Sequence, residues 1–392
     1  MHKKLIKVGR DLPSPSHVKD NMNLIQARPF DGIAVRFPRE LGRGDIFDVA
    51  YWQSIASTRQ RLQETQLDIL SSIGWGECLG DNFLVIHGAS TMDWFSDADW
   101  DDVLSHVRFC ARAARAGRCK GLLWDPEPYG NINPWVYTQQ PEYEKRSFSD
   151  YEEMVRRRGG QFIAALQEEF PGIHLLAMRI LSDFAVGSPF SNRLLAEHDP
   201  AKRKKGMTTT YYGLHPAFFN GMLDELAPEA MITDANEDAY YYTSEMEYYR
   251  IYHALRQDAL TLVAGEHHRR YASQVGIGHA VSIDYVVGNW ANAIKAFPPR
   301  LRRQALYLSP EEQMKWFEHN TYHALRTADQ YVWLWSEDMD WWTGRNIPDG
   351  AVEAVQSAKS RLERHEPLGF GVEEMLLEAQ ARAAAVGDPD TE

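Results

Sequence analysis

Short apolar runs alternate with longer amphipathic stretches along this chain of 392 residues. Each run is short enough for a β-strand and is bounded by turn or polar residues. The predicted strands cover residues 4–9, 31–37, 82–88, 121–127, 174–181, 230–235, 277–285 and 329–336. The stretches between and after them have a helical period and cover residues 16–27, 47–73, 100–117, 149–170, 216–226, 244–273, 310–327 and 352–364. Helix starts are expected at Ser149-x-x-Glu152 and Ser309-Pro-Glu-Glu312, since both resemble capping boxes.

Eight strands that alternate with eight helices predict an α/β fold, a single (β/α)₈ TIM barrel. The chain is longer than the ~250 residues typical of this fold, and the surplus follows the fourth, fifth and seventh strands, at about 128–148, 182–215 and 286–309. Loops after barrel strands build the catalytic end. We therefore expect one barrel domain over residues 1–386 and a polar tail over 387–392.

Composition excludes several classes of protein. The formal net charge is −13 and no basic stripe is present, so nucleic acid is not expected as a partner. The sequence has no run of 18 apolar residues, so no membrane span is expected. It shows no secretory leader, so the expected location is the cytoplasm, or outside the cell or in the periplasm if a leader was removed. Three cysteines without a CxxC spacing favour free thiols. The basic run at 201–206 predicts a solvated loop. The sequence leaves open whether the protein forms a homo-oligomer.

The fourth predicted strand ends in the most informative segment of the chain, Gly121-Leu-Leu-Trp-Asp-Pro-Glu-Pro-Tyr-Gly130. Asp125 and Glu127 are spaced i, i+2, so both side chains leave the same face of an extended strand. Trp124 and Tyr129 are expected to surround these acids with aromatic surface. Two carboxylates beside aromatic rings are typical of a site that handles sugars.

Other strand ends carry polar and aromatic residues that are candidates for substrate binding. On the eighth strand Trp333, Trp335 and Glu337 share a face, and Trp341 follows. The remaining candidates are Arg36 on strand two, His87 on strand three, Arg179 and Asp183 on strand five, Asp234, Asn236, Glu237 and Tyr240 at the end of strand six, and His279 and Asp284 on strand seven. Because the carboxyl ends of barrel strands meet at one end of the fold, these side chains are expected to converge.

Cleavage of a glycosidic bond needs one carboxylic acid that protonates the leaving oxygen and one carboxylate that acts as nucleophile or base. Glu127 is the expected general acid/base, because it is the outermost acid of its strand and aromatic neighbours would desolvate it. Asp125 would orient Glu127 or stabilise charge at the reacting centre. The expected partner is Glu337, with Asp234 and Glu237 as alternatives.

At the two segments Trp-Asp-Pro-Glu-Pro-Tyr and Trp-Leu-Trp-Ser-Glu the chain resembles the (β/α)₈ glycoside hydrolases. The resemblance implies that Glu127 is the acid/base and that Trp335 forms the floor of the subsite for the cleaved sugar. It also implies a carbohydrate substrate and no cofactor. The chain departs from the largest clan, since strand four lacks an Asn-Glu pair and strand seven ends in Asp284. No specific family follows from these segments.

Two other functions remain open. A metal-dependent barrel hydrolase or sugar isomerase would need converging ligands, for which His87, Asp125, Asp234 and His279 are candidates. A paired-histidine HxH motif is absent, and His267-His268 is expected inside a long helix, where adjacent residues do not face one another. We therefore expect no metal. A non-catalytic carbohydrate-binding barrel would have similar aromatic residues without separate roles for the acids.

Overall fold

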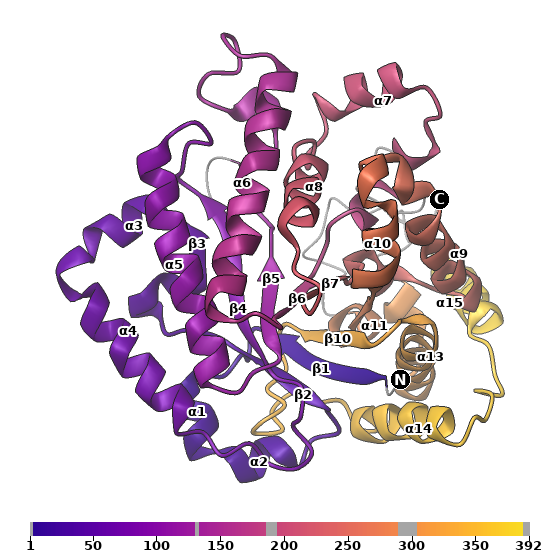
Figure 1. Cartoon of the computed structure of the whole chain (residues 1–392). Helices are drawn as coiled ribbons and strands as arrows, with labels where there is room; N and C mark the ends of the chain where they lie inside the picture. The colour runs from indigo at the N-terminus through magenta and orange to yellow at the C-terminus, as the bar shows by residue number, and fades with distance from the viewer. Residues whose placement is uncertain (1–2, 130–132, 186–193, 289–303, 387–392) are drawn as a thin grey trace.

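A parallel β-sheet forms the centre of the molecule. The computed structural model describes residues 3–129, 133–185, 194–288 and 304–386. Its strands are β1 (Lys4–Gly9), β2 (Gly32–Val35), β3 (Asp45–Phe47), β4 (Phe83–Ser90), β5 (Gly121–Asp125), β6 (His174–Ala177), β7 (Met231–Asp234), β8 (Val275–Ile277), β9 (His279–Ser282) and β10 (Tyr331–Ser336). The ribbon in Figure 1 shows these strands surrounded by helices.

The sheet closes on itself through β8 and β9. Its strand order is β8-β7-β6-β5-β4-β2-β1-β10-β9, and every pairing along this path is parallel. Only Gly278 separates β8 from β9, and its amide donates to the Asp234 carbonyl of β7 at 2.8 Å. Residues 275–282 therefore act as one bent strand that joins β7 to β10. The chain is a (β/α)₈ barrel, and the eight predicted strands are confirmed.

The short strand β3 adds a ninth segment that the apolar pattern did not predict. It pairs with β4 beyond the point where β2 ends, since Val35 pairs with Leu84 and Asp45 pairs with His87. Gly44 leads into β3 with its backbone against β4, where an added Cβ would lie 2.6 Å from the Val85 carbonyl oxygen. This extension brings Asp45 to the carboxyl end of the barrel.

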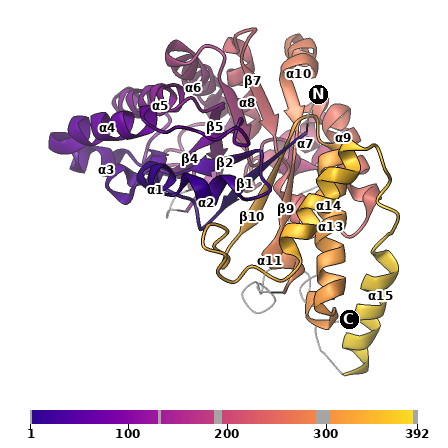
Figure 2. The ribbon, with the colours of Figure 1, turned by 90° about the horizontal axis from the view of Figure 1, so that it is seen from below.

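Helices cover the outside of the barrel. The α-helices are α1 (Pro15–Asp20), α2 (Met22–Gln26), α3 (Val49–Ser54), α4 (Ala56–Ser71), α5 (Asp97–Ala116), α6 (Phe148–Glu169), α7 (Pro200–Met207), α8 (His215–Glu225), α9 (Glu245–Arg256), α10 (His268–Gln274), α11 (Ile283–Val286), α13 (Pro310–Thr327), α14 (Ala351–Glu363) and α15 (Glu373–Ala385). The 3₁₀ turns are η1 (Arg39–Gly44), η2 (Tyr137–Gln139), η3 (Ser182–Phe184), η4 (Leu194–Ala196), η5 (Glu237–Tyr241), η6 (Asp258–Thr261), η7 (Gly265–His267) and η8 (Gln304–Tyr307). Helices α6 and α8 lie side by side in Figure 1, and α13 and α14 do so in Figure 2.

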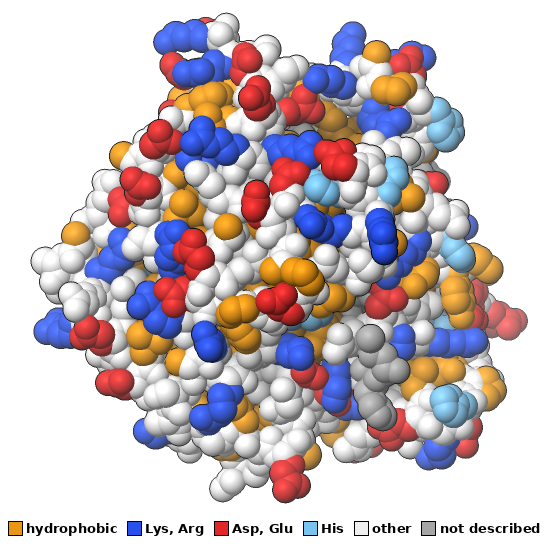
Figure 3. Space-filling view, viewed as in Figure 1, with side chains coloured by type: hydrophobic (Ala, Val, Ile, Leu, Met, Phe, Trp, Pro, Cys, Tyr) orange, Lys and Arg blue, Asp and Glu red, His pale blue; other side chains and the backbone are white. Residues whose placement is uncertain are grey.

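Three local predictions about helices were wrong. Helix α6 starts at a capping box formed by Ser147 and Asp150, so Ser149 lies inside the helix. The basic run at 201–206 belongs to α7, because Asp199 caps the helix and Pro200 suits its first turn. Lys and Arg side chains gather over α7 in Figure 3. The stretch 244–273 divides into α9, η6, η7 and α10, so His267 and His268 do not share one long helix.

Other predictions concern the cysteines, the loops and the tail. Cys78, Cys110 and Cys119 are free thiols, as expected. In the described part of the chain, no helix is both long and apolar enough to cross a membrane. The predicted loops contain the segments 130–132, 186–193 and 289–303, and these lie outside the described residues, as does the predicted tail at 387–392.

The interior of the barrel is filled by alternate residues of each strand. Tyr331 of β10 packs edge-on against Phe83 of β4 and His174 of β6, with ring centroids 5.2 and 4.8 Å apart, so its side chain points inward. Side chains two residues along a strand share its direction. Trp333 and Trp335 therefore continue the inward row of β10 toward the carboxyl end of the barrel. The same alternation decides which residues of every other strand reach that end.

Candidate active site

A cleft of about 440 Å³ opens at the carboxyl end of the barrel. It is lined by residues from β1, β3, β4, β5 and β10 and from segments that follow the strands. The lining residues are Gly9, Arg10, Leu12, Arg36, Gly42, Arg43, Asp45, Val85, His87, Asp125, Glu127, Tyr129, Met178, Glu237, Tyr240, Trp333, Trp335 and Glu337. The structure thus brings together most of the residues that the strand ends predicted.

The end of β5 forms one wall of this cleft. Asp125 and Glu127 continue the inward row of the strand, as their spacing predicts. The Tyr129 hydroxyl lies 2.9 Å from Asp125 Oδ2 and 2.8 Å from Glu127 Oε2, so the two carboxyl groups share its single proton. His87 Nδ1 lies 3.3 Å from Asp125 Oδ2, and the Glu127 amide donates to Asp125 Oδ1 at 2.9 Å. Asp125 therefore has partners on both oxygens and holds the segment that carries Glu127.

Glu237 brings a further buried carboxyl group from η5, the turn after β7. Its Oε2 lies 2.6 Å from Arg179 Nη2, and Arg179 Nη1 also donates to Asp183 at 3.0 Å. One guanidinium thus contacts two acids, and burial raises the pKa of Asp183 well above its usual range. Burial raises the pKa of Glu237 to about 7, Arg179 opposes this shift, and the neighbouring Glu127 and Asp125 carboxyls add to it. The pKa of Glu237 therefore lies above that of a solvated glutamate.

The end of β10 supplies the aromatic wall. Trp333 and Trp335 both line the cleft, and the Tyr240 ring packs 5.2 Å from Trp333. Trp335 Nε1 donates to Glu337 Oε2 at 3.1 Å, and Glu337 also forms an ion pair with Arg10. Burial raises the pKa of Glu337, and Arg10 opposes that shift. Arg10, Leu12 and Glu337 also border a second hollow of about 1130 Å³ that continues from the cleft.

Several predicted site residues do not line the cleft. Trp124 has the opposite parity to Asp125, so its buried ring packs outward against Phe162 and Phe218 of α6 and α8. Asp234 also points outward, and it accepts hydrogen bonds from the amides of residues 180, 181 and 182 and from the Ser182 hydroxyl. Asn236 is buried and donates to the Tyr242 hydroxyl, and Trp341 is buried with its ring against Phe30. Their positions correct the expectation that they meet the substrate.

Arg179 does not line the cleft but holds Glu237 in it. His279, proposed as a metal ligand, is buried outside the barrel interior against Tyr248, with ring centroids 5.4 Å apart. The metal set His87, Asp125, Asp234 and His279 is therefore divided, because Asp234 and His279 lie on the outward rows of β7 and β9.

Sequence reasoning missed Asp45 and Arg43. Both line the cleft from the segment between β2 and β4. Burial raises the pKa of Asp45 to about 8, with a smaller opposing effect of its hydrogen bond from the Phe47 amide. The strand β3 has only three residues, too few for an alternating pattern to show. The pair of glycines around Arg43 was the available signal, since Gly42-Arg43-Gly44 indicates an unusual turn.

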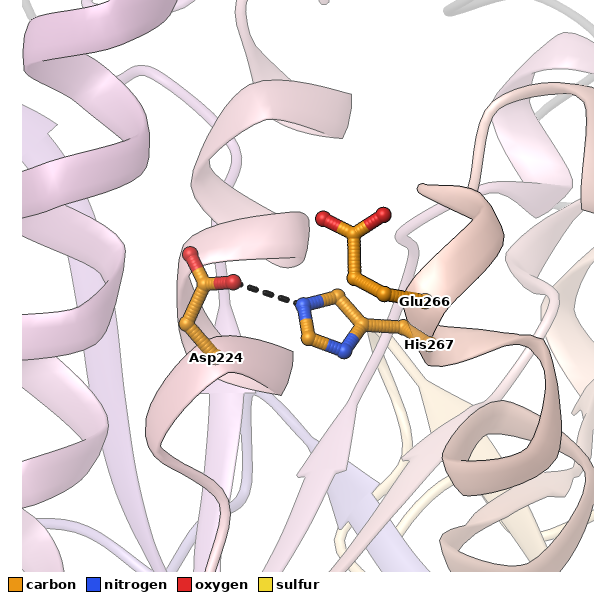
Figure 4. Close-up of side chains that lie close together, drawn as sticks. All are labelled: Asp224, Glu266 and His267. Carbon is orange, nitrogen blue, oxygen red and sulfur yellow. Dashed lines mark hydrogen bonds and ion pairs between the residues drawn. The ribbon is translucent and has the colours of Figure 1, made fainter.

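One group of potential metal ligands was found in the described part of the chain, and it lies outside the cleft. Asp224 of α8 faces Glu266 and His267 of η7, and the His267 ring bonds to Asp224 Oδ1 at 2.6 Å (Figure 4). Arg156 of α6 pairs with Asp224 at 2.7 Å and with Glu266 at 2.8 Å. The Arg156 guanidinium occupies the position that a metal cation would take between these acids. Its ion pairs therefore connect α6, α8 and η7.

The fold and the site together define a (β/α)₈ barrel with an acidic, aromatic cleft at the carboxyl end of its strands. No protein-family model matches the chain, and no curated protein matches it. Similar solved structures include a broad-specificity GH5-4 endoglucanase from an uncultured bacterium, with 11% identity, a TM-score of 0.40, and 89% of this chain and 85% of that chain covered.

Two further solved structures are similar to the same extent. A glucosidase from Croceicoccus marinus has 12% identity and a TM-score of 0.44, with 92% of this chain and 67% of that chain covered. A β-mannanase from the blue mussel Mytilus edulis has 12% identity and a TM-score of 0.38, with 94% of this chain and 95% of that chain covered. Similarity at this level identifies neither a family nor an activity. The fold assignment rests on the strand pairing of this chain.

Proposed function

We propose that this protein is a glycoside hydrolase that cleaves its carbohydrate substrate in the cleft at the carboxyl end of the barrel. The observation that carries the proposal is that Glu127 and Glu237 line one cavity together with Trp333 and Trp335. Two carboxyl groups with different environments beside indole rings are what hydrolysis of a glycosidic bond requires.

Glu237 is the proposed proton donor. Its pKa of about 7 keeps a substantial protonated fraction at neutral pH, which a general acid needs. The sequence expectation gave this role to Glu127. The exchange follows from burial and from the sharing of Arg179 between Glu237 and Asp183.

Glu127 is the proposed carboxylate that attacks the anomeric carbon or activates a water molecule. The Tyr129 hydroxyl and the turn stabilised by Asp125 hold its carboxyl group at the cleft. Because both acids face the same cavity, a sugar bound there can contact Glu127 at its ring carbon and Glu237 at its leaving oxygen.

Trp335 and Trp333 are the proposed stacking surface for the sugar. Indole rings contribute large apolar area with few rotatable bonds, and such rings are typical of binding pockets. Glu337, which the sequence suggested as the second catalytic acid, is held by Trp335 and Arg10 and is proposed to contact sugar hydroxyl groups.

The test uses aryl glycosides with poor and good leaving groups and the variants Glu127→Gln and Glu237→Gln. We expect Glu237→Gln to lose about 10²–10⁴-fold in turnover of the poor leaving group and much less with the good one, because the good one departs without a proton. Glu127→Gln should lose activity on both substrates. The basic limb of kcat/KM, near pH 7 in the wild type, should disappear in Glu237→Gln.

Glu64→Gln on the exposed surface of α4 is the matched control and should keep wild-type rates. If the leaving-group dependence appears in Glu127→Gln instead, the two roles are exchanged. Saturable binding of oligosaccharides without cleavage of any glycoside would show a carbohydrate-binding barrel and contradict the proposal.

A further inference from the structure

Among the described residues, two arginines of the cleft have no acidic partner. Arg36 follows β2 and continues its inward row, and Arg43 lies in η1. In the described part of the chain, neither guanidinium forms an ion pair or a hydrogen bond with another side chain. Arg36 is partly buried, and its burial together with the nearby positive charge of Arg43 lowers its pKa. Two like charges are thus held near one another in a protein whose net charge is −13.

The acids of the cleft are mostly engaged elsewhere. Asp125 is bonded to His87 and Tyr129, Glu237 pairs with Arg179, and Glu337 pairs with Arg10. Glu127 accepts from the Tyr129 hydroxyl. Asp45 lies closest in the chain to Arg43, but burial raises its pKa to about 8, so it is largely uncharged at neutral pH. The two guanidinium groups therefore keep their hydrogen-bonding capacity for a ligand.

The backbone around Arg43 is strained. Gly42, Arg43 and Gly44 have φ values of 55°, 56° and 89°, so three successive residues have left-handed backbone. A residue with a side chain adopts this conformation only at a cost in conformational energy, so the surrounding structure must maintain it. The Tyr51 ring lies against Gly42, and Gly44 lies against the β4 backbone, so packing on both sides maintains the turn. Its effect is to place Arg43 at the cleft.

We propose that Arg36 and Arg43 form a subsite for a negatively charged substituent of the sugar, a carboxylate or a sulfate or phosphate ester. Guanidinium groups bind such oxyanions through paired hydrogen bonds, and two of them can share one anionic group. The inference rests on the proposed function and narrows its substrate class to acidic saccharides. The same cleft then holds the cleaved bond at Glu127 and Glu237 and the charged substituent at the arginines.

The experiment compares aryl glycosides of one sugar that differ only at one carbon, as the neutral alcohol, the carboxylate and the sulfate ester. We expect the preferred anionic substrate to exceed the neutral one in kcat/KM by roughly 10- to 100-fold, the effect of charge-assisted hydrogen bonds. In Arg36→Gln/Arg43→Gln this preference should vanish, so that the ratio of kcat/KM for the anionic and the neutral substrate falls to about one. Comparison of the carboxylate with the sulfate identifies the anion.

Arg39→Gln is the matched control, because Arg39 begins the same turn but does not line the cleft. If the double variant fails to fold, Arg43→Gln alone tests the subsite, since Arg43 is exposed and its loss leaves no buried gap. Equal kcat/KM for neutral and anionic substrates, or an unchanged preference in the arginine variants, would overturn the inference and leave the hydrolase proposal intact.

Binding measurements separate the two proposals. Calorimetry with the free uronic acid and the free neutral sugar should show binding of the acid to the wild type and to Glu127→Gln, and weaker binding to Arg43→Gln. If no glycoside is cleaved but this pattern holds, the hydrolase proposal fails and the anion subsite stands.

Discussion

The carboxyl ends of β5 and β7 both carry a buried aspartate, yet the two residues have different functions in the structure. Asp125 is 3% exposed and Asp234 is 2% exposed. Asp125 lies on the inward row of its strand and lines the cleft beside Glu127. Asp234 lies on the outward row, where three backbone amides and one hydroxyl donate to it. The direction of the side chain, rather than burial or residue type, separates an acid of the cleft from an acid that supports a loop.

The most demanding test of this comparison is at Glu127. Glu127→Gln should reduce turnover by about 10²–10⁴-fold, because the amide cannot act as nucleophile or base. Its unfolding midpoint should stay within a few degrees of the wild type, since Tyr129 can still donate to the amide oxygen. Steady-state kinetics and thermal unfolding of the same preparation check both statements. A stable variant with near wild-type turnover would remove Glu127 from the mechanism.

The opposite result is expected at Asp234. Asp234→Ala should lower the free energy of unfolding by about 3 kcal/mol or more, because it leaves the donors of residues 180–182 without an acceptor. Urea unfolding measures this loss, and Asp234→Asn should lose less because its amide oxygen still accepts. Unchanged stability of Asp234→Ala would show that the loop after β6 does not depend on this carboxylate.

The stability of the protein as a function of pH tests the environment of Asp45, a third acid at this end of the barrel. Its pKa rises from 3.8 to about 8 on folding, so the folded protein binds more protons than the unfolded chain between these values. Stability from this group is therefore complete below about pH 4 and is lost as the pH rises toward 8. Asp45→Asn stays neutral, so its stability relative to the wild type should rise by up to about 4 kcal/mol between pH 5 and pH 8.

Urea unfolding at both pH values measures this gain. Asp101→Asn on the exposed surface of α5 is the control and should show no such trend. If Asp45→Asn follows the wild type at every pH, the carboxyl of Asp45 is charged in the folded protein at neutral pH.

Trp335 and Trp124 also differ in side-chain direction, inward and outward, and a smaller effect is expected from their substitution. Trp335→Ala should raise KM about tenfold and lower kcat as well, because a stacking surface contributes in both the ground and the transition state. Trp124→Phe should lower the unfolding temperature and leave KM unchanged, since its ring packs between the sheet and α6 and α8. A rise in KM for Trp124→Phe alone would contradict the assignment of its face.

The smallest effect is expected from chelation. EDTA should leave kcat and KM unchanged, because the acids of the cleft are assigned to proton transfer and nucleophilic attack. Activity measured before and after dialysis against EDTA checks this. A loss that Mn²⁺ or Zn²⁺ restores would favour the metal-dependent alternative and assign the cleft acids as ligands.

The barrel could be predicted from the sequence because each strand produces a short apolar run. All eight predicted runs contain an observed strand. The run at 277–285 contains β9, and β8 ends at its first residue. Alternation within a strand also placed Asp125 with Glu127 and Trp333 with Trp335 in one cleft. The same rule, applied strictly, would have placed Trp124 on the outside.

The rest of the site depends on contacts that no pattern in the chain records. Asp45 and Arg43 come from a three-residue strand and a left-handed turn, neither of which has a period. The raised pKa of Glu237 depends on burial and on the carboxyls of Glu127 and Asp125, and it is opposed by Arg179, which is 58 residues away and also contacts Asp183. Charge sharing of this kind is a property of the folded chain, so the sequence identified Glu237 as a candidate but not its role.

The pairing of β1 with β10 determines the order in which the protein can complete its fold during synthesis. Six residue pairs join Lys4–Gly9 to Tyr331–Ser336, so the first strand made finds its partner only after more than three hundred residues have followed. Until then one side of β1 and one side of β9 have free backbone groups, and free strand edges favour intermolecular association. Closure therefore comes late, and the edges of β1 and β9 stay open to pairing with other chains until β10 has been made.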